Sequence, residues 1–186
     1  MNDKEFNEKK KELMKPDYTE NLHHVLEELQ IEDARKIVES MTDMEIGQKV
    51  NIRQHQEDYI ADYLEYLWEI SESAYWRHLK STIDTKFGLL WGGDVPHFVK
   101  LCNKEIPNDV WEAVLDFALN VEIKGNYTQD FEAIGCVIKA QVEKFGRLKE
   151  IKKRISFLDK DNQDAANNRI KEMLNSKCNY QFFYDE

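Results

Sequence analysis

The chain has 186 residues, of which 41% are hydrophobic and 33% are charged, and its formal net charge is −10 at pH 7. This composition indicates one globular domain over residues 1–186 and excludes an intrinsically disordered chain. The acidic balance also argues against direct nucleic-acid binding, which needs lysine and arginine to neutralise phosphates. Only 7 Gly and 3 Pro are present, and this scarcity of turn-forming residues favours helices over strands.

The N-terminal third predicts three short helices. A charged helix is expected over residues 4–15 and should end at Pro16, because proline cannot continue a helix. Helices at 18–29 and 32–40 follow, each with apolar residues at helical spacing along one face.

A long helical pattern begins after Thr42, which forms a capping-box pair with Glu45, and continues to about Thr85. We expect one long central helix here, interrupted at most near Gly47. The C-terminal half then predicts further helices, separated by Gly92-Gly93 and by Gly125-Asn126, at 95–104, 109–123, 128–158 and 161–176. The fold class is therefore all-α, an irregular bundle of six to eight helices.

The last ten residues, 177–186, form an aromatic tail. We expect it to pack on the body of the protein, because four large aromatic rings are too apolar for a free terminus. An exposed peptide that inserts into a partner's groove is the alternative. The rings belong to Tyr180, Phe182, Phe183 and Tyr184.

The cysteines and the hydropathy pattern indicate the cellular compartment in which we expect the protein. The three cysteines are widely spaced and include no CxxC pair, which predicts reduced thiols in a cytoplasmic protein and no structural zinc. No stretch approaches the roughly 18 apolar residues of a membrane span, so we expect no membrane association. The cysteines are Cys102, Cys136 and Cys178.

The main functional candidate is a row of acids between Arg53 and Arg77, a stretch with no lysine or arginine. On one helix, five of these acids would fall within about 80° of one another. Like charges one turn apart cost a helix a few tenths of a kcal/mol per pair, and such local conflicts tend to mark function. With two nearby aromatic residues they form the predicted partner-binding set, Asp58, Asp62, Glu65, Tyr66, Glu69, Glu72 and Trp76.

Two simpler interpretations of the acidic row stay open. The row could be an ordinary solvated helix face, or it could be neutralised inside the chain by the basic cluster between Lys144 and Arg154. That basic cluster is itself a weak nucleic-acid candidate, because its charges lie all round the helix and the rest of the protein is acidic.

Metal chemistry is the second functional candidate. Glu20 and His23 form one ExxH motif, and His55 and Asp58 lie one helical turn apart. Di-iron bundles need a second ExxH motif and two further glutamates, and the sequence has no second ExxH motif. None of these short motifs identifies a family, and we expect neither a cofactor nor a metal.

We therefore expect a non-enzymatic, cytoplasmic acidic protein that binds and inhibits a basic partner protein. An immunity protein or a phage-type inhibitor of a nuclease or toxin fits this description, because an acidic helix can act as a charge mimic of nucleic acid. The alternatives are a metal-dependent helical-bundle enzyme and a self-associating structural subunit.

Overall fold

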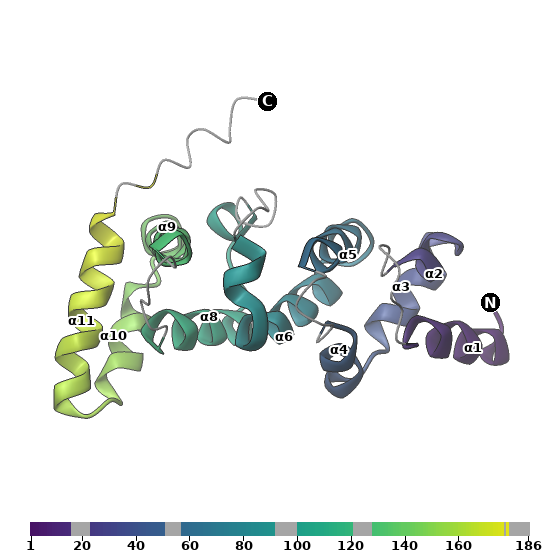
Figure 1. Cartoon of the computed structure of the whole chain (residues 1–186), viewed down its shortest axis with the longest axis horizontal. Coiled ribbons are helices and arrows are strands. Elements are labelled where there is room, and N and C mark those ends of the chain that lie inside the picture. Colours follow the sequence, from purple (N-terminus) through teal and green to yellow (C-terminus); the bar gives the residue numbers. More distant parts are fainter. Residues whose placement is uncertain (16–22, 51–56, 92–99, 121–127, 177, 179–186) are drawn as a thin grey trace. The chain divides into compact units, whose positions relative to one another are not determined.

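The computed structural model describes residues 1–15, 23–50, 57–91, 100–120, 128–176 and Cys178. All regular structure within these residues is helical, so the all-α prediction is confirmed (Figure 1). The chain divides into two compact units, residues 1–90 and residues 91–186. The helices of the first unit are α1 (Asp3–Leu13), α2 (His24–Glu27), α3 (Ile31–Glu39), α4 (Asp43–Val50), α5 (Glu57–Ile70) and α6 (Glu72–Trp91), the last of which ends at the unit boundary.

The first unit is built on the contacts of α3 with α1, α2 and α5. Helix α3 buries Ala34, Ile37 and Val38, which lie on one face because they are three and four positions apart. The predicted capping box at the start of α4 is confirmed. The Thr42 amide donates to Glu45 Oε2 at 2.7 Å, and the Glu45 amide donates to Thr42 Oγ1 at 3.2 Å.

The prediction of one long central helix from Thr42 to Thr85 is wrong. Helices α4, α5 and α6 take its place, and Ser71 separates the last two. The Ser71 hydroxyl accepts a hydrogen bond of 3.2 Å from the Ala74 amide and donates one of 2.7 Å to Glu39 Oε1. Ser71 thus acts as the N-cap of α6, a role for which serine is among the preferred residues.

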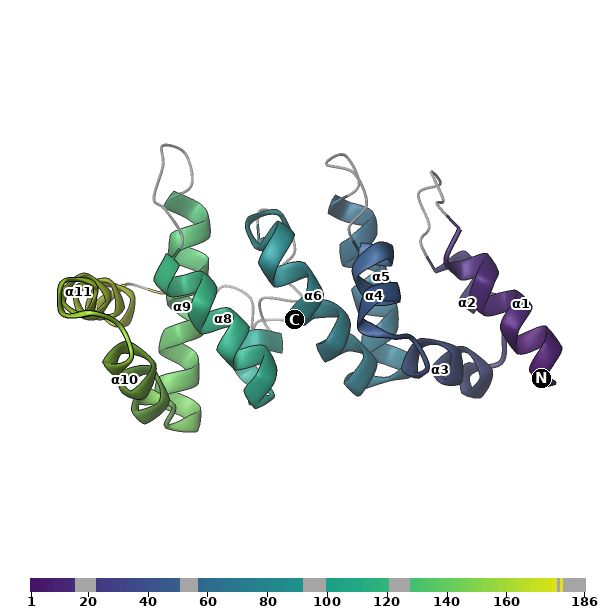
Figure 2. The same ribbon diagram turned by 90° about the horizontal axis from the view of Figure 1, so that it is seen from below.

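The second unit contains α8 (Asn108–Asn120), α9 (Thr128–Phe145), α10 (Leu148–Ser156) and α11 (Lys160–Asn175), and residues 100–103 are also helical. Helix α9 packs against α11 and α8, and Figure 2 shows α8 and α9 lying side by side. The predicted helix over 128–158 is divided into α9 and α10 by Gly146, whose φ of 73° is the left-handed conformation that glycine adopts without steric cost. The described residues therefore hold more helices than the six to eight expected.

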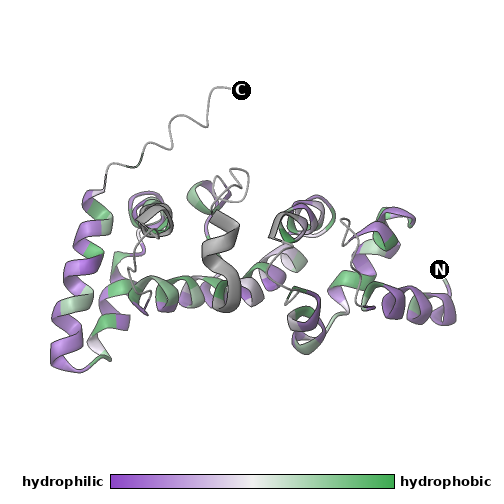
Figure 3. Cartoon of the chain, viewed as in Figure 1, coloured by the Kyte–Doolittle hydropathy of each residue, from purple (hydrophilic) through white to green (hydrophobic). Residues whose placement is uncertain are grey.

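Helices α1 and α8 differ in how apolar they are. In Figure 3, α1 is coloured mostly hydrophilic, in agreement with Leu13 being its one buried residue. Helix α8 is coloured mostly hydrophobic, and it buries five residues of the second core: Val110, Trp111, Val114, Leu115 and Ala118. Neither α8 nor any other helix among the described residues is long and apolar enough to cross a bilayer.

The expectation of three reduced cysteines is wrong. Cys136 on α9 and Cys178, beyond the end of α11, form a disulfide, whereas Cys102 is a buried free thiol. The partners are 42 residues apart in sequence, and only the packing of α9 against α11 brings them together. Apart from Cys178, the aromatic tail 177–186 lies outside the described residues, so its predicted packing stays a prediction.

Candidate protein-binding surface

Helix α5 carries the central part of the acidic row. Its inward face is buried at Ile60, Tyr63, Leu64 and Leu67, which recur every three or four residues. Asp62 and Glu69 lie on the exposed side, and Glu65 is partly exposed. The predicted orientation of this part of the row is therefore confirmed, because burial of the apolar face turns the acids outward. The side chain of Asp58 lies outside the described residues.

The last acid of the row belongs to another helix. Because Ser71 separates α5 from α6, Glu72 lies in the first turn of α6. A carboxylate there interacts favourably with the positive end of the helix dipole. Its Oε1 atom also accepts a hydrogen bond of 3.3 Å from Trp76 Nε1. Glu72 is exposed, but it also has a local stabilising role.

Trp76 is mostly enclosed by its neighbours. It is only 5% exposed, and its ring packs edge-on against Tyr75 at 5.0 Å and against Trp68 at 6.0 Å between centroids. Little of the indole surface is left for a partner. Of the two predicted aromatic anchors, Tyr66 is therefore more accessible to a partner than Trp76.

Tyr66 lies among acidic and aromatic groups. Its ring stacks on the His23 imidazole with centroids 4.7 Å apart. Partial burial raises the pKa of the Tyr66 phenol, and the negative charges of Glu27 and Glu69 raise it further. The phenol is therefore neutral at pH 7 and can donate a hydrogen bond.

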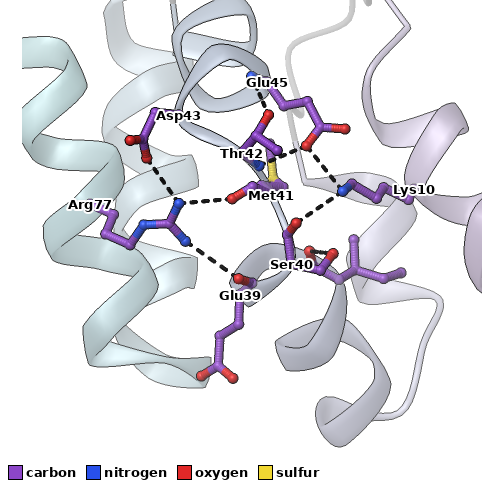
Figure 4. Close-up of polar contacts among 9 residues, drawn as sticks. Lys10, Glu39, Ser40, Met41, Thr42, Asp43, Glu45 and Arg77 are labelled. Atoms are coloured by element: carbon purple, nitrogen blue, oxygen red, sulfur yellow. Dashed lines mark hydrogen bonds and ion pairs between the residues drawn. The ribbon is translucent and has the colours of Figure 1, made fainter.

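Arg77, the first cation after the acidic row in sequence, is engaged elsewhere (Figure 4). Its guanidinium donates to the Met41 carbonyl at 2.8 Å and to the Glu39 carbonyl at 3.3 Å, and it pairs with Asp43 at 3.0 Å. Figure 4 also shows Lys10 held by the Ser40 carbonyl and by Glu45. These contacts satisfy carbonyls at the end of α3, so Arg77 is not a counter-ion of the acidic row.

The basic cluster 144–154 finds partners in its own unit. Arg147 is 3% exposed and pairs with Glu105 at 3.2 Å and Glu150 at 3.0 Å. Arg154 pairs with Asp116 on α8. Internal neutralisation of the acidic row by these two arginines is therefore not supported, because their guanidinium groups already have carboxylate partners.

Among the described residues, Asp62, Glu69 and Glu72 form no ion pair with a lysine or arginine. Asp62 interacts electrostatically with the His23 imidazole, and Glu69 with the Tyr66 phenol.

The residues of the alternative metal site are mostly not described. Glu20 and His55 lie outside the described residues, as does the Asp58 side chain. His23 occupies the N-cap position of α2, where burial lowers the pKa of its imidazole below 6.5. In the described part of the chain, no group of three or more His, Cys, Asp and Glu side chains is arranged to hold a metal ion.

A set of buried polar side chains in the first core was missed by the sequence analysis. Lys49 is 5% exposed, and its ammonium group lies 5.9 Å from the centroid of the Tyr63 ring. Fully buried His78 meets the same ring edge-on at 5.6 Å. A signal was present, because Lys49 adjoins Val50 and His78 follows Ala74 by one turn on apolar helix faces.

Comparisons of the chain with protein-family models, with curated proteins and with solved structures found no match in any of the three. The function is therefore argued from the residues alone.

Proposed function

We propose that the chain is a non-enzymatic acidic protein that binds a basic surface of another protein through α5 and the start of α6. A nuclease or other nucleic-acid-binding protein fits as the partner, because its substrate groove is basic. Carboxylates projecting from a helix present negative charge at spacings that such a groove accepts. Covering the groove would inhibit the partner.

The observation that carries this proposal is the state of Asp62 and Glu69. Both side chains are exposed, and neither forms an ion pair with another described residue. Meanwhile Arg77, Arg147 and Arg154 are held by carbonyls or carboxylates elsewhere. The carboxylates of Asp62 and Glu69 are therefore the ones that we expect a partner to meet.

Of the seven residues predicted to bind the partner, we place a smaller group at the centre of the proposed contact. Asp62, Glu65 and Glu69 supply charge, and Tyr66 between them supplies an aromatic surface and a hydroxyl group. Glu72 lies at the edge of this centre and accepts a hydrogen bond from Trp76, whose ring packs against Trp68. Asp58 extends it by one turn in sequence.

The test reverses the charge of two residues only. In the double variant Asp62→Lys, Glu69→Lys, capture of a basic protein from an extract of the native host should fall at least about tenfold, as expected for two lost charge contacts of more than 0.7 kcal/mol each. The matched control reverses Glu112 and Asp164, two exposed acids of the second unit, to lysine. This control changes the net charge by the same amount and should retain the partner.

The captured protein is identified by mass spectrometry, and its nuclease activity is measured with and without the wild-type chain. Capture should also weaken as sodium chloride is raised, because exposed charge pairs are screened. Equal capture by the Asp62/Glu69 variant and the wild type would refute the proposed surface. Circular dichroism establishes that all three proteins are equally helical.

A further inference from the structure

Cys136 and Cys178 are positioned to form a disulfide without any backbone movement. Their Cα atoms are 5.4 Å apart, inside the range of about 4.4–6.8 Å that disulfides span. Cys136 lies in the middle of α9, whereas Cys178 follows the C-cap residue of α11, Ser176, by two positions. The bond therefore attaches the chain just after α11 to a neighbouring helix of the same unit.

Helices α9 and α11 also contact each other through apolar side chains, apart from this bond. Met173 is fully buried and lies directly against Gly135, where a Cβ atom would be 3.4 Å from Met173 Cγ. Ile134 and Ile138 of α9 and Ile170 of α11 are also buried. These apolar contacts hold the helices together, so the disulfide adds a restraint mainly at Cys178.

The surroundings of the two sulfur atoms favour thiol exchange. Lys139 lies one turn after Cys136, and its Nζ atom donates a hydrogen bond of 3.1 Å to the carbonyl of Ser176, whose hydroxyl oxygen lies 3.2 Å from Cys178 Sγ. A nearby ammonium group stabilises a thiolate, which is the attacking species in disulfide exchange. Cys178 is also partly exposed to solvent, unlike Cys136 and Cys102.

Cys102 provides an internal contrast. It is 1% exposed, and burial raises the pKa of its thiol to about 12. At neutral pH it is therefore protonated and shielded from solvent, and it should take no part in exchange.

From this contrast we propose that Cys136 and Cys178 form a reversible redox switch that exchanges with low-molecular-weight disulfides. In oxidation, one protein thiolate attacks a sulfur of oxidised glutathione and expels one glutathione thiolate, leaving a mixed disulfide. The second protein thiolate then attacks the protein sulfur of that mixed disulfide and expels the other glutathione. Two protein thiols are oxidised, one small disulfide is reduced to two thiols, and the two protons pass to them.

The consequence concerns the end of the chain. In the oxidised form Cys178 is held covalently to Cys136 of α9. In the reduced form that covalent restraint is absent, while the contact between α9 and α11 persists. The switch thus controls whether the chain just after α11 is covalently joined to α9.

The test equilibrates the full wild-type chain in buffers of increasing reduced-to-oxidised glutathione ratio. Samples are quenched with acid, alkylated under denaturing conditions and weighed by intact mass spectrometry. We expect three alkylated thiols at the reducing end and one at the oxidising end, with the half-way point inside the series. Tryptic digestion without reductant should give peptide 178–186 linked to peptide 125–139, because cleavage follows Lys124, Lys139 and Lys177.

Three results would overturn the proposal. A disulfide that survives a large excess of reduced glutathione would be a permanent structural bond. A pair that stays reduced in oxidised glutathione would not be a switch at all. A linked peptide that contains Cys102 would show a different pairing.

Three variants complete the design. Cys102→Ser should leave the titration unchanged, and Cys178→Ser should abolish the linked peptide. Lys139→Gln keeps a hydrogen-bond donor but removes the charge, so it should slow oxidation several-fold without changing helicity. An unchanged oxidation rate in Lys139→Gln would remove the role given to the ammonium group.

Discussion

The ammonium group of Lys49 donates a hydrogen bond of 2.9 Å to the carbonyl oxygen of Leu13, which joins the last turn of α4 to the end of α1. Leu13 is the final residue of α1, so its carbonyl has no partner within the helix. A lysine at this position also interacts favourably with the negative end of the helix dipole. The free-energy cost of burying the Lys49 charge is therefore offset by the contacts of its ammonium group.

Lys49→Met tests this relationship, because it keeps the apolar stem and removes the donor. We expect the free energy of unfolding to fall by about 1–3 kcal/mol, the cost of a buried carbonyl without its donor. Urea denaturation measures the change. The same substitution at Lys4, whose side chain is 86% exposed, should leave stability unchanged within error. Equal stability of Lys49→Met and the wild type would show that the bond contributes nothing.

The buried imidazole of His78 should make stability depend on pH. Burial lowers its pKa to about 4, and the positive charges of Arg77 and Lys49 act in the same direction, against the bond from Nδ1 to the Ala74 carbonyl. As the pH falls, His78 therefore binds a proton near pH 6.5 in the unfolded chain but only near pH 4 in the folded protein. This contribution to stability is complete above pH 6.5 and is lost as the pH falls from 6.5 to about 4.

The loss amounts to on the order of 3 kcal/mol for a group this deeply buried. Urea denaturation at a series of pH values measures it in the wild type and in His78→Phe, which cannot titrate. The variant should be less stable at pH 7 but should show a shallower slope between pH 6.5 and 4. Parallel slopes in the two proteins would rule out His78 as the source.

Arg147 should be irreplaceable by lysine. Its guanidinium donates to the Ile106 carbonyl, to Asn108 at 3.1 Å and to two glutamates, a set that a single ammonium group cannot reach. We expect Arg147→Lys to destabilise the protein by about 2–3 kcal/mol. Arg154→Lys is the matched control, because both side chains of its ion pair are partly exposed, far more than Arg147, and exposed pairs contribute less than about 1 kcal/mol. Thermal unfolding of the two variants should separate them clearly.

Substitution of Gly146 should lower the stability of the protein because of its backbone conformation alone. A Cβ atom there would meet no neighbour within 4 Å, yet the φ of 73° is unfavourable for residues with a side chain. Gly146→Ala should cost about 1 kcal/mol, and Gly146→Asn less, because asparagine tolerates this conformation. Chemical denaturation of both variants gives the comparison. A larger loss in the asparagine variant would contradict the conformational explanation.

The sequence by itself determined the elements whose signals are local. Helix α3, the capping box of Thr42 and Glu45, and the outward orientation of Asp62 and Glu69 all follow from apolar spacing and cap residues within a few positions. The two helix breaks escaped prediction because apolar spacing continues through them, from Leu67 to Ala74 across Ser71 and from Val142 to Leu148 across Gly146.

Only the tertiary structure decided which charges and thiols have partners. Arg77 lies next to Trp76 in sequence, yet its guanidinium reaches carbonyls at the end of α3. Cys136 bonds to Cys178 because α9 and α11 pack together, and the spacing of the cysteines along the chain does not predict that pairing. Backbone periodicity is a property of neighbouring residues, whereas hydrogen bonds, ion pairs and disulfides depend on distances between segments that only the packing of the core sets.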